Sequence, residues 1–374
     1  MTQTAIACSV MRGGTSKGLM FRADDLPADI ATRDAVLLAA MGSPDPREID
    51  GMGGAHPLTS KVAVVGLSQR PDADVEYLFL QVWPDRAEVS DSQNCGNMLA
   101  AVGPFAIDQG LLAAEDGETP VRIWMRNTGT LATAFVRTPD GQVSYAGDAR
   151  IDGVPGSHAP IPIEFADVAG STCGSLLPTG NVVDVVDGIR VTCIDNGMPV
   201  VCLAASDVGL SGTGSPAEIE ADEKAVARIE SLRLAVGPLM NLGDVASSTV
   251  PKISLLSAPA NGGTVSTRTL IPHRVHEAIG VLGAVSVATA CLLPGSVAHE
   301  VAAAAGSLPA TGAYGATDVE VEHPTGFFTV TLDVAVEDGA PVVRKSALLR
   351  TARLLMRGEV LVPSHLWPTQ GARP

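Results

Sequence analysis

The sequence predicts an α+β protein of two similar halves, each a curved sheet wrapped round a central helix. Short runs rich in β-branched residues, separated by Asp, Gly and Pro turns, recur in both halves, as in VAVVGLS and GIRVTCIDNGMPVVCLAA. Each half also holds one strongly apolar helix candidate, CGNMLAAVGPFAIDQG in the first and AIGVLGAVSVATACLLPG in the second. Such apolar helices have to be enclosed, and the surrounding strands predict that sheets enclose them.

The length of the chain supports two domains. At 374 residues it exceeds one core of ordinary size. We expect a first domain at about 1–150, to which about 350–374 return, and a second at 151–349. The break falls in the Gly- and Pro-rich stretch AGDARIDGVPGSHAP, and we expect the active site in the cleft between the domains. Only 13 residues are aromatic, so Val, Leu, Ile and Ala build the cores.

Other elements follow from local patterns. VEYLFLQVWP, VRIWMRNTG, LATAFVRTP and QVSYAGDAR are predicted strands, and the Asp-Gly pair in TPDGQVSY predicts a hairpin. The Asn-Gly pair in IDNGMP predicts a turn between two strands. A long helix is expected over SPAEIEADEKAVARIESLRLAVG, where Ser-Pro and early glutamates mark its start.

Charge and apolar pattern exclude several classes of partner. A net charge of −16 leaves no general basic surface for nucleic acid. No apolar run reaches membrane-spanning length, and MTQTAIACSVMRGG lacks the pattern of a signal peptide, so we expect a cytoplasmic protein without a membrane partner. The six cysteines are scattered and are expected as thiols. His273 and His276 form an isolated HxxH, so no metal site is expected.

A glycine-rich loop near the start suits an anion. In MRGGTSKGLMF, Arg12 and Gly14 are followed by Thr15 and Ser16, which together supply side-chain and backbone donors. The glycine spacing is not that of a P-loop. The alternative is an ordinary glycine turn between two strands.

Lys61 and Cys95 are the candidates for proton transfer. Lys61 opens an apolar strand, and an apolar environment disfavours the ammonium and makes a lysine available as a base. Its commoner alternative is a strand lysine that faces solvent. Cys95 stands at a predicted helix start, where N–H groups and the helix dipole stabilise a thiolate; the alternative is a buried structural thiol. Gly96 permits a close approach there, and Asn94 and Asn97 can bind a carboxylate or a carbonyl.

Further donors stand on glycine-flanked turns and on strands: Asn127, Lys252, Ser266, Arg268 and His273. No GxGxxG follows a strand, so a dinucleotide cofactor has no support and no cofactor is expected. The donor population fits a small polyanionic substrate and proton chemistry without a cofactor.

The motifs MRGGTSKG, LTSKV, QNCGN, GDARIDGVPG, IDNGMPVV, VPK and HRVHEAIGVLGAVSVATA, in this order, resemble the PrpF family along the whole chain. The resemblance implies the diaminopimelate epimerase-like fold, a homodimer and an isomerase of unsaturated di- and tricarboxylates. The substrate it implies is 4-oxalomesaconate, from gallate and protocatechuate breakdown. An aconitate or methylitaconate isomerase is the alternative within this class. The alternative outside this class is a non-catalytic tricarboxylate-binding helper of an aconitase-like enzyme.

The resemblance also implies roles for single residues. The wider superfamily uses two facing cysteines; Cys95 matches the first, but no cysteine stands near IGVLGAVS, and Cys291 lies too far along. PrpF-type enzymes pair a lysine with the cysteine, and Lys61 matches that lysine. We assign Lys61 as the base and Cys95 as its partner acid, with the reversed roles as the alternative. Charge on the dienolate would then be stabilised by Arg12, Thr15, Ser16, Asn94 and backbone N–H groups. The other carboxylates would be held by Asn127, Lys252, Ser266, Arg268 and His273.

Overall fold

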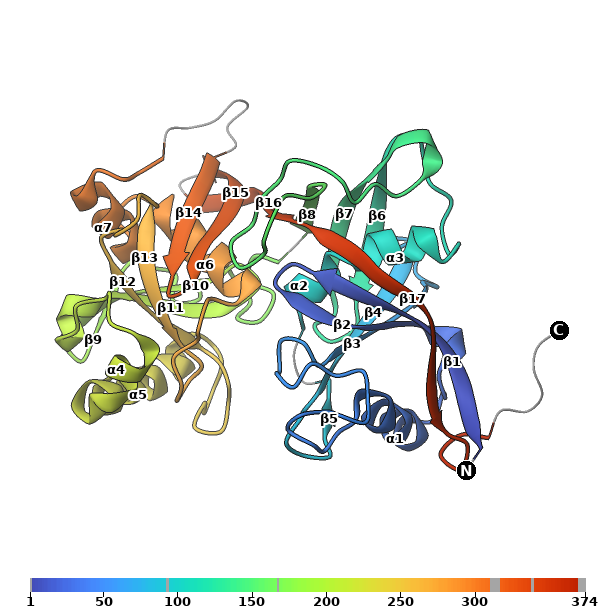
Figure 1. Ribbon diagram of the computed structural model, residues 1–374. Coiled ribbons are helices and arrows are strands. Elements are labelled where there is room, and N and C mark those ends of the chain that lie inside the picture. Colours follow the sequence, from blue (N-terminus) through green and yellow to red (C-terminus); the bar gives the residue numbers. More distant parts are fainter. Residues whose placement is uncertain (1, 92–93, 167, 310–316, 338–339, 369–374) are drawn as a thin grey trace. The chain divides into compact units, whose positions relative to one another are not determined.

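The computed structural model describes residues 2–91, 94–166, 168–309, 317–337 and 340–368. The chain divides into two compact units (Figure 1). Unit 1 comprises residues 1–163 and 350–374, and unit 2 comprises residues 164–349. The last residues of the returning segment, 369–374, lie outside the described residues. Among the described residues, no helix combines the length and the apolar character that spanning a bilayer requires.

Unit 1 is built on one sheet with the strand order β17–β1–β2–β3–β4–β6–β7, in which only the β2–β3 and β4–β6 pairs are parallel. Its strands are β1 (Gln3–Gly13), β2 (Ser16–Arg22), β3 (Lys61–Leu67), β4 (Val75–Val82), β5 (Val89–Ser90), β6 (Gly117–Met125), β7 (Thr130–Thr138) and β17 (Ala352–Pro363). Its helices are η1 (Ala23–Asp25), α1 (Ile30–Met41), α2 (Gly96–Leu99), α3 (Val102–Asp108) and η2 (Pro139–Gly141). Strand β8 (Ile161–Ala166) crosses the boundary between the units.

Unit 2 has the order β9–β10–β11–β12–β13–β14–β15–β16, in which only β11–β12 and β13–β14 are parallel. Its strands are β9 (Asp184–Val186), β10 (Ile189–Asp195), β11 (Pro199–Ala204), β12 (Lys252–Ser257), β13 (Val265–Leu270), β14 (Thr317–His323), β15 (Gly326–Glu337) and β16 (Ala340–Arg350). Its helices are η3 (Ala205–Val208), α4 (Pro216–Ala221), α5 (Glu223–Leu239), α6 (Val281–Cys291) and α7 (Val297–Ala305).

The two units repeat one topology. The crossover between the first parallel pair carries α1 in unit 1 and α5 in unit 2. The crossover between the second pair carries α2 and α3 in unit 1 and α6 in unit 2. Lys61 and Lys252 therefore occupy equivalent places, each as the first residue of the strand after the first crossover. Cys95 and Gly280 are likewise equivalent, as the N-cap residues of α2 and α6.

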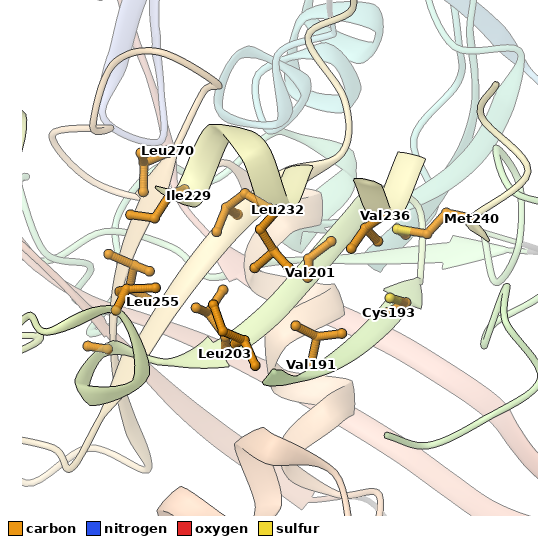
Figure 2. Close-up of a cluster of buried hydrophobic side chains, with 14 of the residues drawn as sticks. Val191, Cys193, Val201, Leu203, Ile229, Leu232, Val236, Met240, Leu255 and Leu270 are labelled. Atoms are coloured by element: carbon orange, nitrogen blue, oxygen red, sulfur yellow. The ribbon is translucent and has the colours of Figure 1, made fainter. Parts of the chain in front are cut away.

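The core of unit 2 on the α5 side is aliphatic, as the low aromatic content predicts. Figure 2 shows Ile229, Leu232 and Val236 of α5, with Met240 at its C-cap, packed on strand residues such as Val201. The apolar helix α6 is buried from Gly283 to Cys291 and contacts four strands of the unit 2 sheet, β10, β11, β14 and β15. Burial of this kind stabilises a fold by about 25 cal/mol per Å² of apolar surface.

Two local predictions are wrong. The first apolar helix is broken into α2 and α3, because Pro104 has no N–H to donate to the carbonyl of Ala100. The predicted hairpin after β7 does not form either. Asp140 (φ 55°) and Gly141 (φ 71°) turn the chain, but the segment after them is not a strand. Tyr145 in it instead donates a hydrogen bond to the Asp108 carboxylate at the end of α3, at 2.7 Å.

Candidate active site

One face of β4 organises the candidate site in unit 1. Alternate residues of a strand point to the same face, so Tyr77, Phe79 and Gln81 share one side of the sheet, and all three are buried. Leu80 and Val82 point the other way, into the core beneath α1. Both candidates for proton transfer contact the face of Tyr77, Phe79 and Gln81.

Lys61 is buried, with 6% of its surface exposed, so the interpretation as a solvent-facing strand lysine is wrong. Lys61 stands directly opposite Gln81 in the β3–β4 pair, and its Nζ donates to Gln81 Oε1 at 2.8 Å. The same Nζ lies 4.9 Å from the centroid of the Phe79 ring. None of the ion pairs in the described part of the chain includes Lys61, so its amine has a neutral amide and a ring face as neighbours.

The half-buried Cys95 is held by its main chain. The Tyr77 hydroxyl donates to the carbonyl of Cys95 at 3.1 Å, and the Cys95 N–H donates to Asn94 Oδ1 at 2.8 Å. Burial, with a smaller contribution from Cys95, raises the pKa of Tyr77 well above its usual value, so the phenol stays protonated and remains a donor. Asn94 Nδ2 also contacts Met125 Sδ at 2.8 Å. The thiol is free, and within the described residues none of these hydrogen bonds uses its Sγ.

The helix behind Cys95 is short. Cys95 is the N-cap of α2, which has four residues, and no side chain caps it. A single turn has a weaker dipole than the long helix expected from the sequence, because aligned peptide dipoles add along the helix. The position of Cys95 therefore depends on its contacts with Tyr77 and Asn94 more than on a helix dipole.

The glycine-rich loop joins β1 to β2 and packs on α2. Asn97 Nδ2 donates to Thr15 Oγ1 at 3.1 Å, and the Thr15 N–H approaches Asn97 Oδ1 at 3.4 Å. Gly14 has φ +50°, and a Cβ there would lie 2.1 Å from Asn97 Oδ1, so a larger residue would be strained and would displace the Asn97 side chain. Arg12 fixes the loop from the other side, since its Nη1 donates to the carbonyls of Gly14 at 2.9 Å and Thr351 at 3.0 Å.

Two donors of this loop are available to an anion. Ser16 Oγ and Arg12 Nη2 are buried and have no hydrogen-bond partner among the described atoms. Burial, and then the charge of Arg353, lower the pKa of the Arg12 guanidinium from its usual value, which is a cost that a bound anion would relieve. The loop therefore has the donor set of an anion site, beside the segment that carries Cys95.

Asn127 has a different environment from the one expected. Its Oδ1 accepts the Phe79 N–H at 2.8 Å, and its Nδ2 donates to the carbonyls of Phe79 at 2.9 Å and Asp91 at 2.8 Å. The side chain thus joins β4 to the main chain at Asp91, the residue after β5. Its polar atoms are engaged by the main chain, and its contact with substrate stays a prediction.

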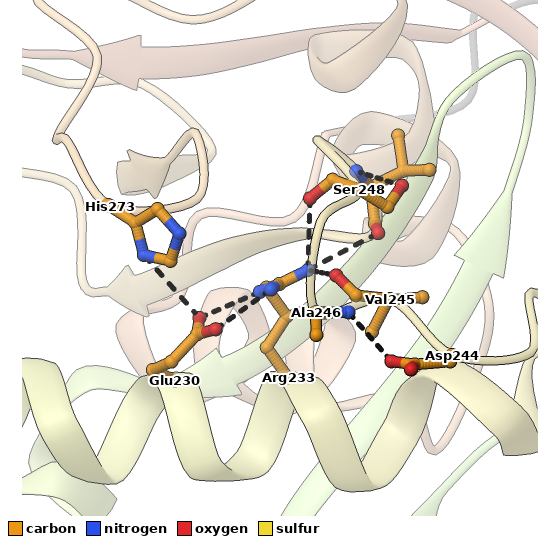
Figure 3. Close-up of polar contacts among 8 residues, drawn as sticks. Glu230, Arg233, Asp244, Val245, Ala246, Ser248 and His273 are labelled. Atoms are coloured by element: carbon orange, nitrogen blue, oxygen red, sulfur yellow. Dashed lines mark hydrogen bonds and ion pairs between the residues drawn. The ribbon is translucent and has the colours of Figure 1, made fainter.

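In unit 2, Lys252 is the counterpart of Lys61. It is half-buried, and burial, followed by repulsion from Arg233, lowers its pKa to about 8. Arg233 is fully buried on α5 (Figure 3). It forms two hydrogen bonds with Glu230 and donates through Nη1 to three carbonyls, those of Val245, Ser248 and Val250.

We expect Arg233→Met to lower the free energy of unfolding by about 2–4 kcal/mol, because the Glu230 carboxylate and three carbonyls lose their donor. Urea denaturation of both proteins measures this. The matched control is Arg228→Met, an exposed arginine on the same helix, which should stay within about 0.5 kcal/mol of the parent. Equal stability of the two variants would contradict the role of Arg233.

The other three predicted residues of unit 2 lie on or after β13. Arg268 donates to the main-chain carbonyls of Gly214 at 2.6 Å, Thr213 at 2.9 Å and Thr267 at 2.8 Å. Ser266 Oγ is 3.5 Å from Arg268 Nη1, the limit of a hydrogen bond. His273 is 65% exposed on its side chain, and its Nδ1 lies 3.9 Å from Glu230 Oε2 (Figure 3). Their contact with substrate stays a prediction.

Within the residues that the structure describes, no group of three or more His, Cys, Asp or Glu side chains is placed to hold a metal ion. The six cysteines are free thiols, and Cys291 is fully buried at the end of α6.

Sequence reasoning missed the residues that hold the site together: Tyr77, Phe79 and Gln81. The stretch VEYLFLQVWP was interpreted as a strand without chemistry. A signal was present, because Gln81 is a polar residue amid an apolar run of β4, and a buried amide needs specific partners.

Comparison with known proteins agrees with this architecture. A family model described as PrpF protein matches residues 3–363. A (4E)-oxalomesaconate Delta-isomerase of Novosphingobium sp. is 61% identical over 95% of this chain and 97% of its own length. A 4-oxalomesaconate tautomerase of Pseudomonas putida is 58% identical over 98% of this chain and 99% of its own.

The solved structure of a methylitaconate-delta-isomerase superposes with a TM-score of 0.84 at 36% identity, over the whole of both chains. The predicted α+β class and diaminopimelate epimerase-like fold are confirmed. The resemblance of the seven sequence motifs to the PrpF family is confirmed as well. The chain belongs to the PrpF family.

Proposed function

We propose that this protein is an isomerase that moves a proton within 4-oxalomesaconate. The observation that carries the proposal is the joint attachment of Lys61 and Cys95 to one face of β4, through Gln81 and Tyr77. Two relatives at 61% and 58% identity, one named for isomerisation and one for tautomerisation of 4-oxalomesaconate, support the substrate. The presence of both Lys61 and Cys95 supports catalysis over a helper role, which would not need both groups.

The reaction needs two proton transfers. The neutral amine of Lys61 removes a C–H proton next to a carbonyl or carboxylate and becomes an ammonium. The electron pair spreads over the conjugated system as a dienolate, and the Cys95 thiol delivers a proton at its far end. The net change is an isomerisation, and solvent exchange returns a proton from the ammonium to the thiolate. Each such acid or base typically contributes about 10²–10⁴-fold in rate.

The donors of the glycine-rich loop would stabilise the negative charge that develops on the substrate. The dienolate carries more negative charge on its oxygens than the ground state does, so donors aimed at those oxygens stabilise the transition state most. Arg12 Nη2 and Ser16 Oγ are two such donors in the glycine-rich loop, both buried and without a hydrogen-bond partner among the described atoms.

The test is proton exchange. The purified protein is incubated in D₂O with 4-oxalomesaconate, cis-aconitate, trans-aconitate and a methylitaconate, each separately, and the substrate carbons are followed by NMR. We expect 4-oxalomesaconate to isomerise with incorporation of deuterium and to be the preferred substrate. Preference for an aconitate or for the methylitaconate would instead favour the alternative within this class, an aconitate or methylitaconate isomerase. Turnover of none of them would contradict the enzyme and favour the helper.

A methylitaconate isomerase is the second candidate, because a solved structure of that name superposes over the whole chain. Its identity of 36%, against 61% and 58%, makes it the weaker one. A cytoplasmic location and a homodimeric state stay predictions.

A further inference from the structure

Gln81 is a buried polar side chain in an apolar strand. It is 1% exposed, and a buried amide costs free energy unless its donors and its acceptor are paired. Its Nε2 lies 3.1 Å from each of three carbonyl oxygens, those of Pro57, Ser60 and Val82. Its Oε1 accepts from Lys61 Nζ at 2.8 Å. Both ends of the amide are therefore used.

The three carbonyls determine which way the amide points. If the amide were turned over, its oxygen would face three other acceptors, so only the NH₂ group suits that side. The oxygen of Gln81 must then face Lys61. Because an N–H of Lys61 serves this oxygen whether the amine is charged or neutral, the lone pair of the neutral amine points away from Gln81.

The loop before Lys61 is held in place by hydrogen bonds to the buried carboxylate of Glu48. Glu48 is 2% exposed, and its Oε2 accepts the Ala55 N–H at 2.7 Å and a short hydrogen bond from the Ser60 hydroxyl. Ser60 in turn supplies one of the carbonyls that Gln81 holds. A continuous chain of buried hydrogen bonds thus runs from Glu48 through Ser60 and Gln81 to Lys61, and such a network rigidifies what it holds.

Unit 2 offers an internal comparison. Lys252 occupies the place of Lys61, but β13 ends at Leu270, which lies opposite Ile253, so no β13 residue stands opposite Lys252. Gln81 is therefore a feature of unit 1 and not a general consequence of the topology.

We propose that Gln81 is a positioning residue for the isomerisation, which orients the Lys61 amine and allows it to alternate between its charged and neutral forms. The proposal rests on the proposed role of Lys61 as the base. A neutral amide suits a base better than a carboxylate does, since a carboxylate in contact with the amine would favour the ammonium form and reduce the fraction able to accept a proton.

Two variants distinguish an effect of Gln81 on the position of the Lys61 amine from an effect on its charge. Gln81→Met removes the acceptor at similar size, and we expect kcat to fall about 10- to 100-fold with KM changed less than about 3-fold, since a misplaced catalytic group costs on that scale. Gln81→Glu places a carboxylate against Lys61. The acid limb of its pH–rate profile should move to higher pH, because the amine then loses its proton at higher pH.

A titration without substrate tests the same claim. The chain has five lysines, so ¹³C labelling at their ε-carbons gives few NMR signals, and Lys61→Met assigns that of Lys61. Its midpoint should move to higher pH in Gln81→Glu and to lower pH in Gln81→Met. The signal of Lys224, an exposed lysine on α5 without a predicted role in the site, is the internal control and should be the same in both variants.

The wild-type protein supplies a readout that needs no variant to fold. Its Gln81 side-chain amide signals should shift with pH at the midpoint of Lys61. An unchanged Lys61 midpoint in a folded variant, or a wild-type amide that does not respond, would overturn the role of Gln81. Because no substrate is used, this result is independent of whether the protein isomerises 4-oxalomesaconate.

Discussion

Lys61→Met is expected to lower kcat by about 10²–10⁴-fold while the fold is retained. Methionine fills a similar volume beside the Phe79 ring but can neither take up a proton nor donate to Gln81 Oε1. Steady-state kinetics with 4-oxalomesaconate measure the loss, and thermal unfolding checks the fold.

The control for this loss is Lys224→Met. Lys224 is an exposed lysine on α5. Its replacement by methionine is the same substitution as Lys61→Met, at a position that is far in sequence from every predicted site residue. Its kcat should stay within about 2-fold of the parent, since exposed surface substitutions have small effects. If Lys61→Met were as active as Lys224→Met, the buried lysine would not be the base.

Cys95→Ser is the second variant with a large expected effect, a loss of kcat of about 10²–10⁴-fold. The main chain is held by Tyr77 and Asn94, so the hydroxyl should occupy the place of the thiol. A serine hydroxyl is a much weaker acid than a thiol and transfers its proton less readily. Kinetics and thermal unfolding are measured as for Lys61→Met.

Cys8→Ala is the matched control for the thiol. Cys8 is buried on the α1 side of the unit 1 sheet, in the core with Leu80 and Val82. Its replacement removes a sulfur from the same unit, so it should lower stability by about 1 kcal/mol and leave kcat nearly unchanged. Full activity in Cys95→Ser, or an equal loss in Cys8→Ala, would count against Cys95 as the acid.

Much of the architecture was accessible from the sequence. The apolar stretch from AIGVLG onward becomes α6, and the Asn-Gly turn joins β10 to β11 as predicted. These predictions hold because periodicity and turn chemistry are local properties. The long helix predicted over SPAEIEADEKAVARIESLRLAVG is helical but, like the first apolar helix, is divided in two, here into α4 and α5, which meet at Asp222.

The candidate site was accessible only in part. Lys61, Cys95 and the MRGGTSKG loop have recognisable motifs, and the loop does pack beside the Cys95 segment through Asn97. Gln81 could not be assigned to Lys61, because their contact depends on the register of β3 with β4, which no short pattern determines. The engagement of Asn127 with Phe79 was hidden for the same reason.

The pairing of Lys61 with Cys95 is tested most directly by site-specific deuterium exchange in D₂O with the two catalytic variants. We predict that Cys95→Ser still exchanges the proton that Lys61 removes but forms almost no product, because delivery at the far carbon is lost. Lys61→Met should show neither exchange nor product. Exchange at the abstracted position in Lys61→Met at the wild-type rate would contradict the account.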